Sequence, residues 1–319
     1  MRRLSTTIAG VAAALTLAAC SGGNYSSTPL PIPSASETES GSSSTATTIG
    51  CENATQSYDP LSSTPGAADI DDAGMADIID RGYLIVGVSA DSYLLGANNP
   101  MTGQIEGFDI DFARAIAEAL FGDPNRLRLV VITAAQRIPF LQDGTVDIVA
   151  RNMTMTCDRW EDIAFSAEYY RSGQKVLVSR DSDAQTLEDL AGQRVCAPGG
   201  TTSLAKLEEV GGTEVVTAGS HTGCLILFQQ GQADAITGDD TVLAGLAAQD
   251  PYAKITEAEA ITEEPYGIGV SADNEYLARY INAVLEELRD SGQWEDIYNR
   301  WLASSLGEAP EPPTPSYGR

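Results

Sequence analysis

An internal repeat is the feature of this sequence that most restricts its fold. Leu141–Val149 (LQDGTVDIV) resembles Phe228–Ile236 (FQQGQADAI), with a glycine and an aspartate at the same places in both. In each copy an apolar segment with helical spacing ends at a glycine, which favours a helix C-terminus, and the short apolar segment that follows predicts a strand. Two copies of a helix followed by a strand predict two similar α/β lobes in one chain.

The segments around the repeat continue the alternation of strands and helices. Amphipathic stripes predict helices over 107–120 and 276–288, and short apolar runs predict buried strands. The predicted strands are Leu84–Val88, Leu129–Thr133, Val146–Ala150, Lys175–Ser179, Arg194–Ala197 and Ala235–Thr237. Such alternation predicts open, mainly parallel sheets whose ligands bind beyond the carboxyl ends of the strands, and therefore in a cleft between the lobes.

The charge of the chain excludes some classes of partner. It has 45 acidic and 19 basic residues, for a formal net charge of −26. A chain this acidic offers no basic field for nucleic acid or for an anionic lipid surface. If the ligand is an anion, its positive partner must lie within the cleft, since salt screens charges beyond about 8 Å.

The N-terminal residues have the features of an export signal. Arg2 and Arg3 precede a short apolar run that ends in Leu17-Ala-Ala-Cys20. The run is too short to span a bilayer as a helix, and small residues before the cysteine suit cleavage. These last residues resemble a bacterial lipobox, which implies a signal peptide over 1–19 and lipidation of Cys20; a plain secretory signal is the alternative.

Two segments are predicted to lack a core of their own. The region 20–71 begins with a long stretch of Ser, Thr, Gly and Pro, and 306–319 is rich in proline. Segments with so few apolar residues do not bury enough surface to offset their ordering entropy. We therefore predict a flexible tether over 20–71 and a disordered tail over 306–319.

Four cysteines remain besides Cys20, namely Cys51, Cys157, Cys196 and Cys224. An even number in an exported protein predicts two disulfides, with three possible pairings. A metal site is the rival interpretation, but the chain has no C-x-x-C motif and a single histidine, which argues against zinc. We expect neither a metal nor a cofactor.

Several motifs, in order along the chain, resemble polar amino-acid binding proteins of bacterial ABC importers. The resemblance covers about 82–302 and is strongest to the glutamate-binding lipoproteins of actinobacteria. The motifs are Gly107-Phe-Asp-Ile-Asp111, Arg137-Ile-Pro139, Met153-Thr-Met-Thr156-x-x-Arg159, Phe165-Ser166-x-x-Tyr169-Tyr170, Gly200-Thr-Thr-Ser203, Asp239-Asp240 and Tyr266-Gly-Ile268.

This resemblance implies a two-lobed type II periplasmic-binding-protein fold. Lobe 1 would comprise 72–176 and 265–305, and lobe 2 would comprise 177–264. Two crossing strands, expected near Gln174–Val178 and Pro265–Gly269, would form a hinge that closes when a ligand contacts both lobes.

The division into lobes also implies a disulfide pairing. Cys196 and Cys224 both fall in lobe 2, so we pair them with each other. Cys51 is then left to pair with Cys157.

The resemblance further implies which residues hold the backbone of a free amino acid. Arg159 corresponds to an arginine that grips the α-carboxylate, and Asp239 to an aspartate that pairs with the α-ammonium. Other expected contacts surround these two residues: Asn152, Met153, Thr154, Thr201 and Thr202.

Three residues are expected near the ligand's side chain. Arg137 and His221 stand where glutamate/aspartate-binding relatives have an arginine and a histidine. Arg151 ends a strand at a position that contacts the side chain in relatives for basic amino acids. A structural or surface role is the alternative for each of the three.

These residues predict an acidic ligand, L-glutamate or L-aspartate, with asparagine as a weaker one. Arg137 and Arg151 are surplus positive charges once Arg159 holds the α-carboxylate, and a second carboxylate would satisfy them. The expected protein is a monomer, anchored by lipid outside the cytoplasmic membrane, that delivers its ligand to an ABC permease.

Two other functions remain open on the sequence. The protein could be a sensor that signals to a membrane partner, because the binding step would be identical. It could also be a dehydratase on the same fold, with Asp239 or Glu106 as an acid. The motif Ser203-Leu-Ala-Lys206 lacks the elements that accompany S-x-x-K in hydrolases, so we do not expect an enzyme.

Overall fold

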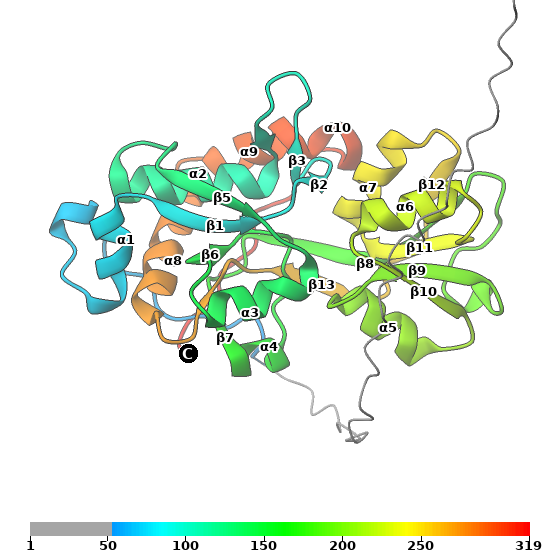
Figure 1. Cartoon of the computed structure of the whole chain (residues 1–319), viewed down its shortest axis with the longest axis horizontal. Helices are drawn as coiled ribbons and strands as arrows, with labels where there is room; N and C mark the ends of the chain where they lie inside the picture. Colours follow the sequence, from blue (N-terminus) through cyan, green and yellow to red (C-terminus); the bar gives the residue numbers. More distant parts are fainter. Residues whose placement is uncertain (1–52) are drawn as a thin grey trace, which may run out of the picture. The chain divides into compact units, whose positions relative to one another are not determined.

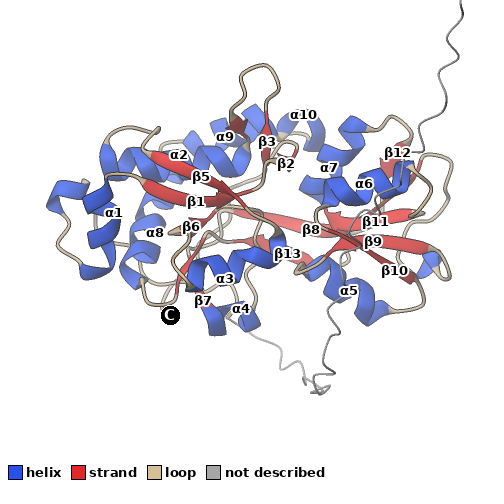
Figure 2. Cartoon of the chain, in the orientation of Figure 1, coloured by secondary structure: helices blue, strands red, loops and turns tan. Residues whose placement is uncertain are grey.

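The computed structural model describes residues 53–319 of the chain. The predicted signal peptide, Cys20, Cys51 and the tether up to residue 52 lie outside the described residues. Figure 1 shows two lobes, each built on one β-sheet, and Figure 2 shows helices on both sides of each sheet. Within residues 53–319, none of the helices has the length and apolar character needed to cross a membrane.

Lobe 1 contains a five-stranded sheet in the order β5-β1-β6-β14-β7. β1 pairs in parallel with β5 and β6, whereas β14 pairs antiparallel with β6 and β7. The strands are β1 (Leu84–Val88), β5 (Leu127–Val131), β6 (Ile148–Val149), β7 (Ile163–Phe165) and β14 (Gly269–Ser271). The helices of this lobe are α1 (Ala76–Arg81), α2 (Phe108–Phe121), α3 (Arg137–Gln142), α4 (Cys157–Asp162), α8 (Glu275–Asp290), α9 (Gln293–Trp301) and α10 (Ala303–Leu306).

Lobe 2 repeats this plan with the order β10-β9-β11-β8-β12. β9 pairs in parallel with β10 and β11, and β8 pairs antiparallel with β11 and β12. The strands are β8 (Tyr170–Ser179), β9 (Arg194–Pro198), β10 (Glu214–Ala218), β11 (Ala235–Asp239) and β12 (Ala253–Ile255), and the helices are α5 (Thr202–Val210), α6 (His221–Gln229) and α7 (Asp240–Gln249).

Both sheets are mixed, which corrects the prediction of mainly parallel sheets. The strands that end at the cleft are parallel to one another. β8 and β14 instead start at the hinge and run away from it, so each enters its sheet antiparallel to its neighbour. The two-lobed α/β fold itself is as predicted.

Two adjacent strands join the lobes. β13 (Glu263–Tyr266) pairs antiparallel with Tyr170–Gly173, the first part of β8. Residues Gln174–Val178, where we expected the first crossing, pair with β11 and lie inside the second sheet. The first crossing therefore comes earlier in the chain than predicted.

The internal repeat forms matching units in the two lobes. α3 and α6 are each followed by a glycine with positive φ, Gly144 (72°) and Gly231 (66°), before β6 and β11. The shared aspartates also have matching roles, because Asp147 accepts from the backbone N–H of Ile85 (2.7 Å) and Asp234 from that of Arg194 (2.9 Å). Each aspartate thus fixes the start of the neighbouring parallel strand.

The amphipathic helices bury the stripes that their spacing predicts. On α2, Phe108, Phe112, Ile116 and Leu120 are all buried in the lobe 1 core. Full burial of such a side chain contributes about 1.5–3 kcal/mol.

The smaller elements are a sheet of β2 (Asp91–Ser92), β3 (Gly96–Asn98) and β4 (Ile105–Glu106) and the 3-10 turns Ala67–Asp69, Ala73–Met75, Ala134–Gln136 and Glu188–Leu190.

The end of the predicted tether and the predicted disordered tail are packed together on lobe 1. Ser57 is fully buried, and its backbone N–H donates to the carbonyl of Ser316 (2.8 Å). The Arg319 guanidinium lies 3.8 Å from the ring centroid of Trp160. Disorder is therefore the wrong prediction for 306–319 and for 53–71. Composition misses these segments because only a few of their apolar side chains pack against the lobe 1 core, while long-range backbone and side-chain hydrogen bonds and one cation–π contact also hold them.

Candidate functional site

The loop that follows β6 forms the lobe 1 wall of the candidate site. Asn152 has a positive φ of 36°, a conformation that asparagine tolerates better than most residues. Its backbone N–H donates to Asp109 (2.9 Å), which also accepts from the hydroxyl of Tyr169 (2.7 Å). Burial raises the pKa of Asp109 to about 6. The first turn of α2 therefore holds this loop in place, while the Oδ1 atom of Asn152 is buried without a partner among the described residues.

Arg137 uses its guanidinium on backbone carbonyls. It is 3% exposed and donates to the carbonyls of Ala134 (3.0 Å), Arg151 (3.3 Å), Asn152 (3.2 Å) and, in lobe 2, Gly200 (3.0 Å). Burial holds the pKa of Arg137 well below its usual value. These contacts favour the structural role left open for Arg137, since they leave little of its hydrogen-bonding capacity for a ligand.

Arg159 donates a hydrogen bond to the same lobe 2 carbonyl as Arg137. It is part of α4, whose N-cap Thr156 accepts from its backbone N–H (3.3 Å). Its side chain donates to the carbonyls of Thr154 (2.6 Å) and Gly200 (3.3 Å). Burial lowers the pKa of Arg159, and the charges of Glu264 and Asp239 oppose that shift. Arg159 is thus close to two acidic side chains.

Those acidic side chains belong to a buried group that we call the carboxylate cluster. Asp239, at the end of β11, accepts from the hydroxyl of Tyr266 (2.6 Å). Glu264 on β13 accepts from the hydroxyls of Thr154 (2.6 Å) and Thr202 (2.7 Å). Burial, followed by the charge of Glu264, raises the pKa of Asp239 to about 7. Within residues 53–319 neither carboxylate forms a salt bridge. The carboxylate cluster consists of Asp239, Glu264, Tyr266, Thr154 and Thr202.

Arg151 faces a separate cavity of about 390 Å³ between the lobes, which we call the Arg151 pocket. The side chain is 6% exposed and donates from Nε to the carbonyl of Ile132 (3.0 Å), whereas its two Nη groups form no hydrogen bond with a described residue. Burial lowers its pKa, against the charges of Asp91 and Asp109. The pocket is lined by Ala90, Asp91, Val131, Ile132, Thr133, Gln136, Arg151, Gly219 and Ser220.

Asp91 joins the two walls of the Arg151 pocket. It accepts from the hydroxyl of Ser89 in lobe 1 (2.9 Å) and from that of Ser220 in lobe 2 (2.6 Å). The backbone carbonyl of Asp91 also accepts from Thr222 (2.7 Å). Hydrogen bonds from the start of α6 therefore hold this side of the cleft closed.

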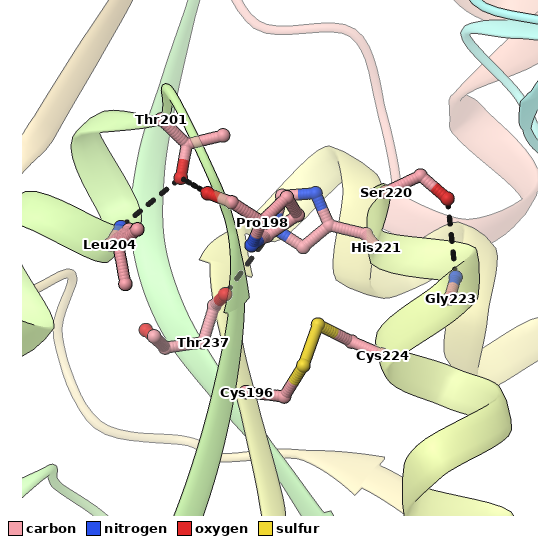
Figure 3. The surroundings of a disulfide bond; sticks show 9 residues. All are labelled: Cys196, Pro198, Thr201, Leu204, Ser220, His221, Gly223, Cys224 and Thr237. Carbon is pink, nitrogen blue, oxygen red and sulfur yellow. Dashed lines mark hydrogen bonds between the residues drawn. A yellow bond between two sulfur atoms is a disulfide. The ribbon is translucent and has the colours of Figure 1, made fainter. Parts of the chain in front are cut away.

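His221 lies near Arg151 and is uncharged at neutral pH. Burial, reinforced by the charge of Arg151, lowers the pKa of His221 to about 4. Its Nε2 lies 3.3 Å from the carbonyl of Thr237 (Figure 3). Because a carbonyl only accepts, Nε2 must carry the proton, which leaves Nδ1 as an acceptor. A neutral imidazole can orient a ligand but adds no positive charge for an acid.

Two predicted contact residues have side chains that serve the fold. Thr201 is the N-cap of α5, because its hydroxyl donates to the carbonyl of Pro198 (2.7 Å) and accepts from the N–H of Leu204 (3.1 Å), as Figure 3 shows. The Met153 side chain is fully buried in a core cluster of lobe 1 that includes Phe165. The side chain of Met153 therefore belongs to the core, and a contact between the backbone of Met153 and the ligand stays a prediction.

Sequence reasoning missed Glu264 and Asp91. Alternation along β13 could have identified Glu264, since it shares a strand face with Tyr266, which belongs to a recognised motif. Asp91 carried no comparable signal, because its position follows from the packing of α6 against β2.

The predicted disulfide between Cys196 and Cys224 is present and joins β9 to α6 (Figure 3). Cys157 is also disulfide-bonded. Cys51 lies outside the described residues, so the Cys51–Cys157 pairing stays a prediction. No group of three or more potential metal ligands occurs in the part of the chain that the structure describes.

Comparison with known proteins identifies the family of the chain. Residues 84–304 match the bacterial extracellular solute-binding proteins, family 3. The chain belongs to this family. It is a family of binding proteins and not of enzymes. A binding role agrees with a candidate site whose residues come from both lobes.

Individual relatives of this solute-binding protein differ in their named ligands. The ABC transporter glutamine-binding protein GlnH of Bacillus subtilis is 34% identical over 73% of this chain and 86% of its own length. The glutamate-binding protein GluB of Corynebacterium efficiens is 31% identical over 74% and 82%. Among solved structures, a mutant of the arginine-binding protein ArgBP from T. maritima matches with a TM-score of 0.68 and 33% identity, over 72% of this chain and 99% of its own.

Proposed function

We propose that this solute-binding protein captures an acidic L-amino acid, glutamate or aspartate, with asparagine as a weaker ligand. Closure of the two lobes would hold the ligand for delivery to an ABC importer at the outer face of the cytoplasmic membrane. The observation that carries the acidic preference is Arg151, a buried arginine with two unengaged Nη groups facing a cavity between the lobes.

A carboxylate is the group that best matches these Nη donors. An arginine presents two parallel N–H groups, and a carboxylate accepts both at once. A buried guanidinium without an anion is unfavourable, and no salt bridge satisfies Arg151 within residues 53–319. A ligand side chain ending in a carboxylate would complete this pair.

The charges elsewhere in the cleft suit the zwitterionic part of an amino acid. Arg159 supplies a cation near the acidic Asp239, and the two belong to opposite lobes. An α-carboxylate on the first and an α-ammonium on the second would engage both lobes at once, which favours the closed state. The unpartnered Oδ1 of Asn152 can accept a further hydrogen bond from the ligand.

Named relatives support transport as the role. The Bacillus subtilis relative is part of an ABC transporter, and the Corynebacterium efficiens relative is a glutamate-binding protein. Each is similar over most of its own length, so the whole binding unit is shared rather than one lobe.

Glutamine is a second candidate ligand, because Asp91 lines the same pocket as Arg151. An amide could accept from Arg151 with its oxygen and donate to Asp91 with its nitrogen. Two relatives, from Bacillus subtilis and Geobacillus stearothermophilus, are named as glutamine-binding proteins. The choice between glutamine and an acidic ligand depends on which group balances the charge of Arg151. If Asp91 balances it, the neutral amide fits; if the ligand balances it, a carboxylate fits.

Calorimetric titration of the purified protein with glutamate, aspartate, glutamine, asparagine and arginine tests the proposal. We expect glutamate or aspartate to bind tightest, asparagine more weakly and arginine not at all. Equal or tighter binding of glutamine would replace the acidic ligand with the amide, and failure of all five would refute amino-acid capture.

A further inference from the structure

Glu264 on the second hinge strand is a buried glutamate to which the proposed ligand contacts assign no role. It is 2% exposed, and its Oε2 atom accepts hydrogen bonds from Thr154 (2.6 Å) and Thr202 (2.7 Å). Its Oε1 atom accepts from Thr262 (2.6 Å). Thr154 belongs to lobe 1 and Thr202 opens the first helix of lobe 2 after β9. A single carboxylate oxygen therefore connects both walls of the cleft.

These bonds determine what the two hydroxyl groups can offer a ligand. An ionised carboxylate only accepts hydrogen bonds, and a hydroxyl group has a single proton, so Thr154 and Thr202 each use that proton on Glu264. Each hydroxyl oxygen keeps a lone pair that can accept. Neither hydroxyl can then donate to a ligand carboxylate, whereas both can accept from an ammonium group.

The charge around Glu264 also calls for a cation. Asp239 is near enough that the charge of Glu264 helps to raise its pKa, and both side chains are buried. Their partners are hydroxyl groups: Tyr266 for Asp239, and threonines for Glu264. Arg159 is near both carboxylates but forms no salt bridge with either of them. Two buried carboxylates whose hydrogen-bond donors are all neutral are costly, and a cation bound between them reduces that cost.

We propose that Glu264 is a positioning and specificity-determining residue for the free α-ammonium of the ligand. It orients Thr154 and Thr202 as acceptors from opposite lobes, and with Asp239 it supplies the negative charge that an ammonium needs. The inference rests on the proposed function only in that an α-amino acid occupies the cleft, whatever its side chain. Compounds that lack the ammonium should be rejected for this reason.

The test compares each amino acid with its analogue lacking the α-amino group. Glutarate is glutamate without the ammonium, and glutaramate is glutamine without it. Calorimetry on the wild-type protein and on Glu264→Gln gives the ratio of affinities within whichever pair contains the tighter ligand. We expect Glu264→Gln to reduce that ratio by at least about tenfold, because it removes one charge-assisted interaction with the ammonium while keeping the size of the side chain.

Two further variants separate this effect from a general structural one. Thr202→Val keeps the shape of the side chain but removes one acceptor, so it should reduce the same ratio by a smaller factor. Glu263→Gln changes the exposed neighbour on the same strand and should leave the ratio at the wild-type value.

The outcomes distinguish the two proposals. If the wild-type protein binds an amino acid but Glu264→Gln and Thr202→Val weaken the amino acid and its analogue equally, the role of Glu264 is refuted and amino-acid binding stands. If the wild-type protein binds the analogue and the amino acid with equal affinity, the ammonium site is also refuted. If it binds no amino acid at all, both proposals fall.

Discussion

The two copies of the internal repeat share a backbone plan but end in different chemistry. Each copy runs from a helix through a positive-φ glycine into a strand that ends at the cleft. At equivalent strand ends, lobe 1 presents Arg151 and Asn152, whereas lobe 2 presents Gly238 and Asp239. The repeated sequence therefore supports the fold, and the residues just beyond it set the sign of the charge on each wall. Opposite signs on opposite walls suit a zwitterion that links the lobes.

The helices of the two copies are also secured differently. Arg137 and Cys224 occupy equivalent positions, because they lie four residues before Leu141 and Phe228, the first residues of the two matched segments. Arg137 holds its lobe through carbonyl contacts, one of which crosses to lobe 2. Cys224 is tied to Cys196 within lobe 2. One of the four contacts of Arg137 therefore depends on lobe closure, whereas the disulfide lies within a single lobe.

Removing the charge of Asp239 should have the largest effect on ligand affinity. It removes the acidic group that distinguishes the lobe 2 strand end from the lobe 1 strand end. Asp239→Asn keeps the acceptor for Tyr266 but loses the negative partner of the α-ammonium. We expect binding of the tightest amino acid to weaken by about 2–5 kcal/mol, measured by calorimetry. Asp240→Asn, on the adjacent residue, is the control; an equal loss there would show that no specific ion pair is involved.

Removing the disulfide tests the device that only lobe 2 has. Cys196→Ala combined with Cys224→Ala should lower the free energy of unfolding by about 2–4 kcal/mol, because the unfolded chain regains freedom. Chemical denaturation monitored by circular dichroism measures this loss. A double variant as stable as the wild type would show that β9 and α6 are held by packing alone.

Adding a side chain to Gly238 tests the strand end that lacks one. A Cβ atom there would lie 2.5 Å from Nε2 of His221, so Gly238→Ala must displace the imidazole. We expect the free energy of unfolding to fall by about 1–3 kcal/mol, and His221→Ala in the same protein to restore part of it. Gly219→Ala, where a Cβ would meet no atom within 4 Å, is the matched control. Additive effects of the two substitutions would contradict the contact.

The pH dependence of binding should report Asp239. Its pKa is about 7, raised by burial and by Glu264, so it loses its charge as the pH falls through that value. If the ionised carboxylate of Asp239 holds the ammonium, the affinity for the ligand is highest above pH 7 and falls by up to about tenfold per pH unit below it. Titrations between pH 5 and 8 should show this slope in the wild-type protein. Asp239→Asn should lose the slope except for a part due to Asp109, whose pKa is about 6.

The sequence predicts the fold well because the fold rests on periodicity and on the repeat. The helices and the strands follow from local patterns, and the Cys196–Cys224 pair follows from the division into lobes that the family resemblance implies. The mixed character of the sheets was missed, because strand direction at the hinge depends on where β8 and β14 start. The packed segments 53–71 and 306–319 were missed because they are held by contacts between residues far apart in the sequence.

The site was harder to predict than the fold, since side-chain partners come from several segments. Sequence reasoning identified Arg137 as a charged residue near the cleft but could not show that carbonyls from three segments converge on it. It also counted the arginines of the cleft without the opposing Glu264 and Asp91. Only the three-dimensional arrangement shows that both Nη groups of Arg151 face the cavity without a hydrogen-bond partner among the described residues.

The most direct test of the proposed ligand is to remove the charge of Arg151 and measure both candidate ligands. Calorimetry should compare L-glutamate with L-glutamine on the wild-type protein, on Arg151→Gln and on Asp91→Asn. We predict that the wild-type protein prefers glutamate, that Arg151→Gln weakens glutamate by about 2–5 kcal/mol but glutamine by less, and that Asp91→Asn does not weaken glutamate. A wild-type preference for glutamine, or undiminished glutamate binding in Arg151→Gln, would contradict the account.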